Sequence, residues 1–414
     1  MTQSQQRPPA PPPGRRPPAP PPGRRPPAPP PKATATPKAR AGSPPRLPNG
    51  KVAPEHTNRP AGQPSCVELL KRSHEEGYSD VHLGVGEVPR VRDRGEMLEL
   101  DYPKTDTATF WSWMQELVTE QEMQQFKDTK ELDTATQYDF SRIRINVFDA
   151  LLGPSIVMRL IPNKILTLEQ LRSPEVFKDI SDAHKGLVLV TGPTGSGKST
   201  TMAAMIDYIN KEHAKHIITI EDPIEFVHQS RKSLIKHREV GTHTLLFDNA
   251  LKAALREDPD LILVGEMRDR GTVNTALKAA QTGHLVMGTL HTNSAVKTID
   301  RILNLYSAEE QDAMQIAIAE SLVAIIAQGL CRTTDGKRAA FHDILINTET
   351  MKEYIAKGRY EEMHELMQTS EYDGMITMNM SLYNLYEEGR ITEETALEKS
   401  PTPNEMAQML RGRI

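Results

Sequence analysis

The chain has 414 residues, of which 25% are charged, and a formal net charge of −5 at neutral pH. This length predicts two or three domains, and no apolar run reaches the roughly 18 residues that a transmembrane helix needs. The N-terminus lacks the apolar core of a secretory signal. Cysteines occur only at positions 66 and 331, which excludes a four-cysteine zinc module and fits a reducing compartment. We therefore expect a cytoplasmic protein.

Residues 1–63 differ in composition from the rest of the chain. They carry eleven Lys and Arg residues and a single acid, Glu55, whereas acids outnumber bases in the remainder. Within 7–32 the unit RPPAPPPGR occurs nearly three times over. Proline fixes φ and removes the backbone donor, so helix and sheet are excluded there and polyproline II or disorder is expected. The sequence predicts a disordered proline- and arginine-rich tail over 1–63.

Two interpretations of this tail stay open. It is either a solvated leader or a tether whose prolines and arginines contact a protein partner or anionic lipid. Nucleic acid is not an expected partner, because no aromatic residues are interleaved with the basic ones.

Residues 64–165 combine helical and alternating patterns. Apolar residues have helical spacing over 67–74 and 109–126, and they alternate with polar residues over 79–83, 142–148 and 155–160. We expect a small α+β domain here, which ends in a linker that starts near Pro162.

From residue 166 onward, short apolar runs alternate with helical patterns. The runs at 187–190, 216–220, 261–264 and 285–288 are candidate strands of a parallel sheet covered by helices on both faces. After residue 307 the chain is expected to be mostly helical, with one buried helix from Gln311 to Leu330. The predicted fold class is α/β, with the large domain at 166–400 and a C-terminal tail at 401–414.

The most informative stretch is LVTGPTGSGKST at 189–200, a buried strand followed by a glycine-rich turn and a helix. It meets the Walker A pattern GxxxxGK[ST]. The glycines allow backbone N–H groups to face a polyphosphate, Lys198 would reach the β- and γ-phosphates, and Ser199 would bind Mg²⁺. The predicted ATP-binding residues are Gly192, Thr194, Gly195, Ser196, Gly197, Lys198, Ser199 and Thr200.

Acidic residues follow two of the other candidate strands. Glu221 and Glu225 come after 216–220, and Glu266 comes after 261–264. The carboxyl ends of parallel strands face one crevice, and ATP hydrolysis needs one carboxylate near Mg²⁺ and another group to orient water. Glu266 is the candidate for the metal, and Glu221 or Glu225 for water. Taken singly, each acid is equally well explained as a surface residue or a helix cap.

The strand at 285–288 is flanked by His284 and His291. Zinc binding is disfavoured, because no third ligand has suitable spacing. A γ-phosphate sensor or a subunit contact fits these histidines better. Arg144 and Arg159 lie on alternating strands of the small domain, where they are either a solvated face or donors of charge to a γ-phosphate. An arginine supplied across a subunit boundary can contribute about 10³–10⁵ in rate.

With these motifs in order, the chain resembles the secretion-type ATPases of type IV pilus systems, in particular the twitching-motility retraction ATPases of the PilT family. The resemblance rests on five segments: SDVHLGVG (79–86), TGPTGSGKST (191–200), TIEDPIEFVH (219–228), ALREDPDLILVGEMRD (254–269) and TGHLVMGTLHT (282–292). It implies a PAS-like domain at 64–165, a RecA-like ATPase domain at 166–400 and a homohexameric ring. It also implies a cytoplasmic position at the inner-membrane base of the pilus, with a membrane platform protein as partner.

The resemblance implies a role for each site residue. Glu225 corresponds to the catalytic glutamate, Glu266 to the Walker B acid that binds Mg²⁺ with Ser199, His284 and His291 to the His box, and Arg144 and Arg159 to the arginines that contact the γ-phosphate. The implied function is a hexameric motor that hydrolyses ATP to power pilus retraction.

Two departures from the family pattern leave alternatives open. Residues 350–357 replace the family's AIRNLIRE sequence, which concerns the coupling to retraction, and the terminal segments 1–63 and 401–414 are additions. They suggest a paralogue that works beside a second retraction ATPase. One alternative is therefore a regulatory ATP-binding paralogue, and another is an adaptor that acts through its tail.

Overall fold

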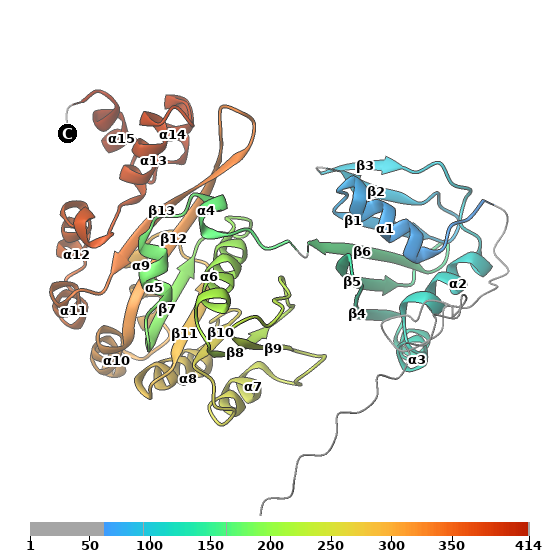
Figure 1. Ribbon diagram of the computed structural model, residues 1–414, viewed down its shortest axis with the longest axis horizontal. Helices are drawn as coiled ribbons and strands as arrows, with labels where there is room; N and C mark the ends of the chain where they lie inside the picture. The colour runs from blue at the N-terminus through green and yellow to red at the C-terminus, as the bar shows by residue number, and fades with distance from the viewer. Residues whose placement is uncertain (1–61, 94, 163, 413–414) are drawn as a thin grey trace, which may run out of the picture. The chain divides into compact units, whose positions relative to one another are not determined.

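The computed structural model describes residues 62–93, 95–162 and 164–412. The predicted proline- and arginine-rich tail at 1–63 lies outside these residues, except for Gly62 and Gln63. One sheet of six strands and one of seven form the centres of two domains, which are described separately below (Figure 1). Within the described ranges, no helix combines the length and apolar character needed to cross a bilayer.

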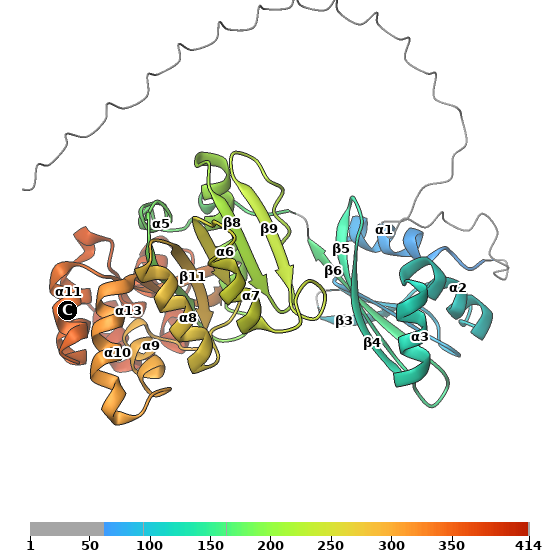
Figure 2. The same ribbon diagram turned by 90° about the horizontal axis from the view of Figure 1, so that it is seen from below.

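The first domain is built on an antiparallel sheet with the strand order β3-β2-β1-β6-β5-β4. Its strands are β1 (Asp80–Gly84), β2 (Arg90–Asp93), β3 (Glu96–Glu99), β4 (Glu131–Gln137), β5 (Ser141–Phe148) and β6 (Ser155–Pro162). Its helices are α1 (Cys66–Glu76), α2 (Thr107–Leu117) and α3 (Glu120–Thr129). Helices α2 and α3 lie on one side of this sheet (Figure 2).

Buried side chains alternate with more exposed ones along β5, and the buried ones mark the face of the sheet that the helices cover. Ile143 and Ile145 are fully buried and pack with Trp113 of α2, whereas Arg144 between them points to the other face. The single helix expected over 109–126 is two helices. Thr119 begins α3 with a capping box, because its side chain accepts from the backbone N–H of Glu122 and the Glu122 carboxylate accepts from the N–H of Thr119.

The second domain contains a mixed sheet with the order β13-β12-β7-β11-β10-β8-β9. Its strands are β7 (Gly186–Thr191), β8 (His216–Glu221), β9 (Leu234–Glu239), β10 (Leu261–Val264), β11 (Leu285–Leu290), β12 (Leu322–Arg332) and β13 (Arg338–Ile346). All neighbouring pairs are parallel except β12 with β13. The four predicted strands are therefore present, in a parallel arrangement as expected.

Helices cover both faces of this sheet. Along β7, Leu187 and Leu189 belong to one buried cluster, and Val188 and Val190 belong to another on the opposite face. The helices are α4 (Leu168–Leu171), α5 (Val176–Ser181), α6 (Lys198–Glu212), α7 (Phe247–Ala254), α8 (Arg270–Gln281), α9 (Ala295–Leu303), α10 (Ala308–Ser321), α11 (Glu349–Ala356), α12 (Tyr360–Thr369), α13 (Met378–Glu387), α14 (Glu393–Lys399) and α15 (Pro403–Leu410), with a short 3₁₀ turn, η1, at Glu371–Asp373.

The prediction of one buried helix from Gln311 to Leu330 is wrong, because α10 is mostly half-buried or exposed, with Ile318, Ala319 and Ser321 as its buried residues, and because the second half of the segment is not helical. The helix α10 ends at Ser321, and the next residues form β12, which pairs with β7 on one side and β13 on the other. A continuously apolar run has no periodicity that separates a buried strand from a buried helix. Here the two neighbouring strands, distant in sequence, decide the conformation.

The C-terminal segment after residue 346 is helical. The residues that depart from the family pattern, 350–357, form most of α11, whose Met351 and Ile355 are fully buried. In the segment 401–414, α15 contributes a fully buried Met406 to a cluster with Leu382 and Ala396. The described part of this segment is therefore packed on the domain.

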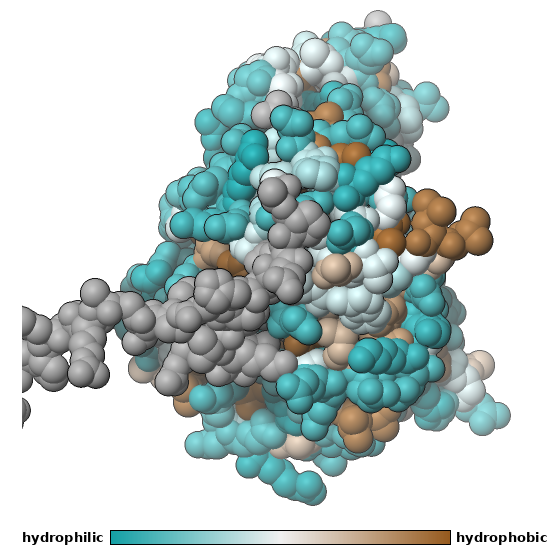
Figure 3. Space-filling view, turned by 90° about the vertical axis from the view of Figure 1, so that its right-hand side faces the viewer, coloured by the Kyte–Doolittle hydropathy of each residue, from teal (hydrophilic) through white to brown (hydrophobic). Residues whose placement is uncertain are grey.

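On the face that Figure 3 shows, hydrophilic residues predominate and hydrophobic residues form small groups. Two exposed apolar residues of the first domain, Leu151 and Leu152, occupy the turn between β5 and β6. Single exposed apolar side chains are normal on a protein surface and carry no functional conclusion.

Candidate functional site

The glycine-rich loop connects the carboxyl end of β7 to the first turn of α6. Gly192, Gly195 and Gly197 all have positive φ values, of 144°, 80° and 87°, which residues with a side chain rarely adopt. The residue that precedes α6 is Gly197, and no side chain caps the helix. The N–H groups of the first turn are therefore available to an anion at the helix N-terminus.

The Lys198 side chain folds over this loop. Its Nζ donates to the carbonyl oxygens of Gly192 at 2.8 Å and Pro193 at 3.1 Å. Burial lowers the pKa of Lys198, while the charges of Glu266 and Glu225 oppose that shift. A phosphate oxygen would offer the ammonium group a stronger, charge-assisted hydrogen bond than either carbonyl.

Not every predicted loop residue borders the cavity. Thr194, Gly195, Gly197, Lys198, Ser199 and Thr200 line a cavity of about 1170 Å³. Gly192 and Ser196 do not, because they lie against β12: the Ser196 carbonyl accepts a hydrogen bond from Gln328 there. These two residues shape the loop and contribute no side chain to the cavity.

Glu266 lies just beyond the end of β10, between the guanidinium of Arg268 and the imidazole of His291. Its Oε2 is 2.5 Å from Nη2 of Arg268, and its Oε1 is 3.0 Å from Nε2 of His291. Hydrogen bonding from Arg268 is the main cause that lowers the pKa of Glu266, and His291 adds to it. The group is therefore a carboxylate at neutral pH, which is the form that a divalent cation binds.

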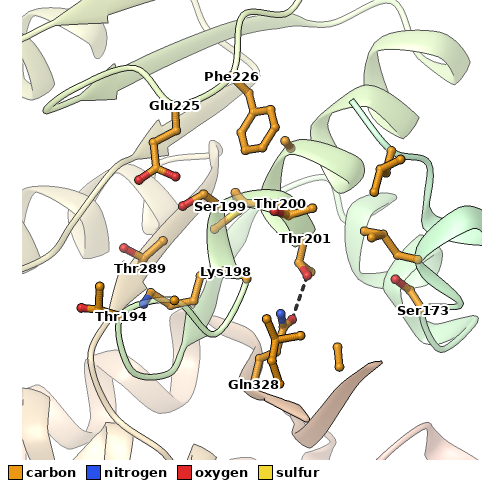
Figure 4. A pocket seen from close by; sticks show the side chains of 18 of the residues that line it. Ser173, Thr194, Lys198, Ser199, Thr200, Thr201, Glu225, Phe226, Thr289 and Gln328 are labelled. Carbon is orange, nitrogen blue, oxygen red and sulfur yellow. Dashed lines mark hydrogen bonds between the residues drawn. The ribbon is translucent and has the colours of Figure 1, made fainter. Parts of the chain in front are cut away.

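Glu225 enters the same cavity from the loop after β8. Figure 4 shows its carboxylate pointing toward Ser199 and the glycine-rich loop from the opposite wall. Glu225 is exposed and makes no ion pair among the described residues. Glu221 is instead buried at the end of β8, where its Oε2 accepts from the backbone N–H of Glu225 at 3.3 Å. Of the two candidates, Glu225 is placed to meet water and Glu221 to hold the loop.

The two histidines lie at opposite ends of β11. His291 follows the carboxyl end and lines the cavity beside Glu266. His284 precedes the amino end, where its Nδ1 lies 3.0 Å from the carbonyl oxygen of Ala279 and its side chain is not part of the cavity wall. The structure thus brings His291, and not His284, to the loop within one chain.

Arg144 and Arg159 lie directly opposite each other in the β5–β6 pairing of the first domain. Arg144 pairs with Asp133 through Nη2 at 2.8 Å, and Arg159 pairs with Asp80 through Nε at 2.8 Å. The side chain of Arg159 is 65% exposed, and neither arginine lines the cavity.

Thr289 and Gln328 are among the cavity residues to which the sequence reasoning assigned no role. Thr289 of β11 donates to the carbonyl oxygen of Gly265 and borders the cavity, and Gln328 of β12 touches the loop from below. Thr289 lies within the segment TGHLVMGTLHT (282–292), but the sequence analysis assigned a role there only to the histidines. Gln328 did carry a signal, since it is a polar residue within an apolar run, but its neighbour could only be known once β12 was paired with β7.

Comparison with known proteins identifies the relatives of this chain. The family described as "Type II/IV secretion system protein" matches residues 67–408. The chain belongs to this family. The type IV pilus retraction ATPase PilT of Pseudomonas aeruginosa is 45% identical over 338 residues, which cover 81% of this chain and 98% of that protein. A twitching motility protein of Neisseria gonorrhoeae is 44% identical over 321 residues, 77% of this chain and 86% of that protein.

The fold comparison agrees with these sequences. The crystal structure of the pilus retraction motor PilT with bound ADP has a TM-score of 0.79 and 41% identity, and the match covers 84% of this chain and all of that one. The Legionella pneumophila ATPase DotB has a TM-score of 0.69 and 26% identity, with 82% and 97% covered. The predicted fold class, the resemblance to the pilus retraction ATPases and the assignment as an ATPase are confirmed.

Proposed function

We propose that this chain hydrolyses Mg²⁺-ATP as a homohexamer and that this hydrolysis powers type IV pilus retraction. The observation that carries the proposal is the convergence of the glycine-rich loop, Glu225, Glu266 and His291 on one cavity. The same combination of a P-loop with two carboxylates is what phosphoryl transfer to water needs. The 45% identity to PilT over nearly the whole length of that protein supports pilus retraction as the process that ATP hydrolysis drives.

The residues around the cavity fit a magnesium ion. Glu266 is held as a carboxylate, and Ser199 offers a hydroxyl from the first turn of α6 on the same cavity wall. Oxygen donors of this kind are those that Mg²⁺ prefers. When bound, the ion would neutralise the charge that develops on the phosphate oxygens.

The chain's own residues divide the remaining work. Backbone N–H groups of the loop and of α6 bind the phosphates, and Lys198 exchanges its two carbonyl partners for phosphate oxygens. Glu225 accepts a proton from water or orients it for attack. His291, within 3.0 Å of Glu266, senses whether that carboxylate is engaged.

Arg144 and Arg159 complete the proposed site from outside. Because neither lines the cavity of its own chain, their role requires a neighbouring subunit or a movement of the first domain. Both are anchored by carboxylates on a sheet surface that leaves them accessible. This is the main support in the chain itself for a ring in which one subunit completes the site of the next, and His284 is proposed as a residue of that subunit contact.

The proposed location is the cytoplasmic side of the inner membrane at the pilus base, with the platform protein as partner. A second retraction ATPase is a further proposed partner. PilU of Pseudomonas aeruginosa, described as a type IV pilus ATPase, is 36% identical over 346 residues, which cover 83% of this chain. The changed residues 350–357, which form most of the packed helix α11, keep a regulatory paralogue as the second candidate.

Steady-state Mg²⁺-ATPase activity of the purified chain, together with its mass in solution, tests the proposal. Lys198→Ala and Glu225→Gln are measured beside it. A hexamer-sized protein whose magnesium-dependent turnover is lost in both variants supports the motor. A chain that binds nucleotide without turnover, and becomes active only when mixed with a second retraction ATPase, supports the regulatory paralogue instead.

A further inference from the structure

Gln328 occupies an unusual position next to the glycine-rich loop. Strand β12 pairs in parallel with β7 up to the pair Ala327–Thr191, so the next residue, Gln328, lies beside the start of the loop. Gln328 is 2% exposed in a strand that is otherwise largely apolar. A buried amide is costly unless both its donor and its acceptor are satisfied.

Both ends of the Gln328 side chain are satisfied by the nucleotide-binding segment. Its Nε2 donates to the carbonyl oxygen of Ser196 at 2.7 Å, and its Oε1 accepts from Oγ1 of Thr201 in α6 at 2.8 Å (Figure 4). One side chain therefore ties the loop to the helix that follows it. It makes these bonds from a strand more than 120 residues away in sequence.

The contact with the loop extends to its first and last glycines. A Cβ atom at Gly192 would lie 2.3 Å from the main-chain oxygen of Gln328, and a Cβ atom at Gly197 would lie 2.9 Å from its Nε2. Real Cβ atoms do not approach other atoms this closely. The loop therefore packs directly against Gln328, and the two glycines allow this close approach.

The packing of the loop against Gln328 determines which backbone groups of the loop face the cavity. A phosphate-binding loop must point its N–H groups at the ligand and its carbonyl groups elsewhere. The Ser196 carbonyl is turned toward Gln328, and Ser196 does not line the cavity. Without the Gln328 donor, this buried carbonyl would lose its partner, and the loop would gain alternative conformations.

We propose that Gln328 is a positioning residue that holds the glycine-rich loop in its phosphate-binding conformation and so sets nucleotide affinity. The inference rests on the proposed function in one respect, namely that this loop binds ATP. Gln328 acts through Ser196 and Thr201, since both ends of its amide are already engaged by them.

The test is nucleotide binding by Gln328→Leu, Gln328→Glu and Thr201→Val in the full chain, measured with a fluorescent ADP analogue. Gln328→Leu removes both hydrogen bonds and leaves the Ser196 carbonyl without its donor, which predicts about tenfold weaker binding through faster dissociation. The KM for ATP should rise by a similar factor while kcat at saturation changes little. Gln328→Glu keeps the acceptor for Thr201 but loses the donor to Ser196, so it should weaken binding at least as much.

Thr201→Val removes only the second bond and should weaken binding by about threefold. In the Gln328→Leu background it should add nothing, because its partner is already gone. Exposed Gln368→Leu on α12 is the matched control and should bind like the wild type. If Gln328→Leu does not fold, Gln328→Glu and Thr201→Val decide the question in its place.

Folded Gln328 variants with unchanged affinity and dissociation rate would overturn the inference, as would a fall in kcat at constant KM. Failure of the proposed function gives a different result. In that case the wild type itself does not bind the ADP analogue, or Lys198→Ala binds it unchanged, whatever the Gln328 variants do.

Discussion

The Nε2 of Gln328 and the carbonyl oxygen of Ser196 are 2.7 Å apart, although Ser196 belongs to the glycine-rich loop after β7 and Gln328 belongs to β12. This bond fixes the underside of the loop whose upper side faces the cavity. The glycine-rich motif therefore does not form the phosphate-binding site alone. Strand β12, whose sequence carries no recognised pattern, supports the loop from the side opposite the cavity.

Gly192→Ala should abolish tight nucleotide binding. The added Cβ would collide with the main-chain oxygen of Gln328 at 2.3 Å, and φ is +144°, so the loop must leave its seat. Gly241→Ala is the matched control, because its φ is +83° but nothing lies within 4 Å of the added atom. Left-handed strain alone costs about 1–2 kcal/mol. Calorimetric titration with ADP should show at least a tenfold loss in the first variant and near-normal affinity in the second.

Glu225→Gln should bind ATP but turn it over slowly. The amide preserves the shape of the side chain and removes its capacity to accept a proton, so kcat should fall by roughly 10²–10⁴. Quenched-flow measurement of phosphate release separates this loss from a loss of binding. Exposed Glu361→Gln on α12 serves as the control. Normal hydrolysis by Glu225→Gln would remove this residue from the catalytic assignment.

Arg144→Ala and Arg159→Ala should each leave ADP affinity nearly unchanged and reduce kcat, by up to roughly 10³-fold. The reason is that neither arginine lines the cavity of its own chain, so each can act only on a site that another element completes. Arg90→Ala, which removes another exposed arginine–carboxylate pair of the same sheet, should retain activity. Mixing Arg159→Ala with Glu225→Gln subunits should restore some turnover if the arginine acts across a boundary. No recovery at any ratio contradicts that arrangement.

Acid should destabilise the second domain through His342. Complete burial lowers the pKa of His342 to about 4 from an ordinary value of 6.5. The unfolded chain then binds a proton more readily than the folded one, so stability is fully present above pH 6.5 and is lost as the pH falls toward 4. The difference between the two pKa values corresponds to a loss of about 3 kcal/mol in the free energy of unfolding.

His342→Phe should flatten part of this pH dependence in urea unfolding, since a neutral ring is kept beside Phe177. It should not flatten all of it, because burial also lowers the pKa of His228 to about 3. An unchanged slope between pH 6.5 and 4 in the variant would show that His342 is not a source of the acid sensitivity.

Much of the second domain could be predicted from short apolar runs, because a strand buried on both faces needs apolar residues at every position. The run 187–190 is such a case. The same property misled the prediction over 311–330, where the apolar run 322–327 was taken as a continuation of the helix but forms part of β12. Gln328 could not be assigned a role for a related reason, since its partners are set by the pairing of β12 with β7.

The site was predictable where chemistry is encoded locally. Lys198, Glu225 and Glu266 belong to contiguous motifs at strand ends, and the structure brings them to one cavity. His284 and His291 flank β11 and therefore lie at opposite ends of this strand, so they do not meet at one site within the chain. Arg144 and Arg159 lie on the sheet of the first domain and do not line the cavity, so their predicted contact with a γ-phosphate stays a prediction.

The uncapped start of α6 links the survival of the second domain to its ligand. Several helices begin with a side chain that accepts from a free N–H group, as Ser65 does for α1, whereas α6 begins at Gly197 and leaves its first turn open to a polyphosphate. A ligand that binds only the folded state at 100 times its dissociation constant adds about 2.7 kcal/mol of stability. When the cellular nucleotide concentration falls, the nucleotide-free enzyme would unfold more often and be degraded faster. The nucleotide concentration would then control the amount of the enzyme as well as its turnover rate.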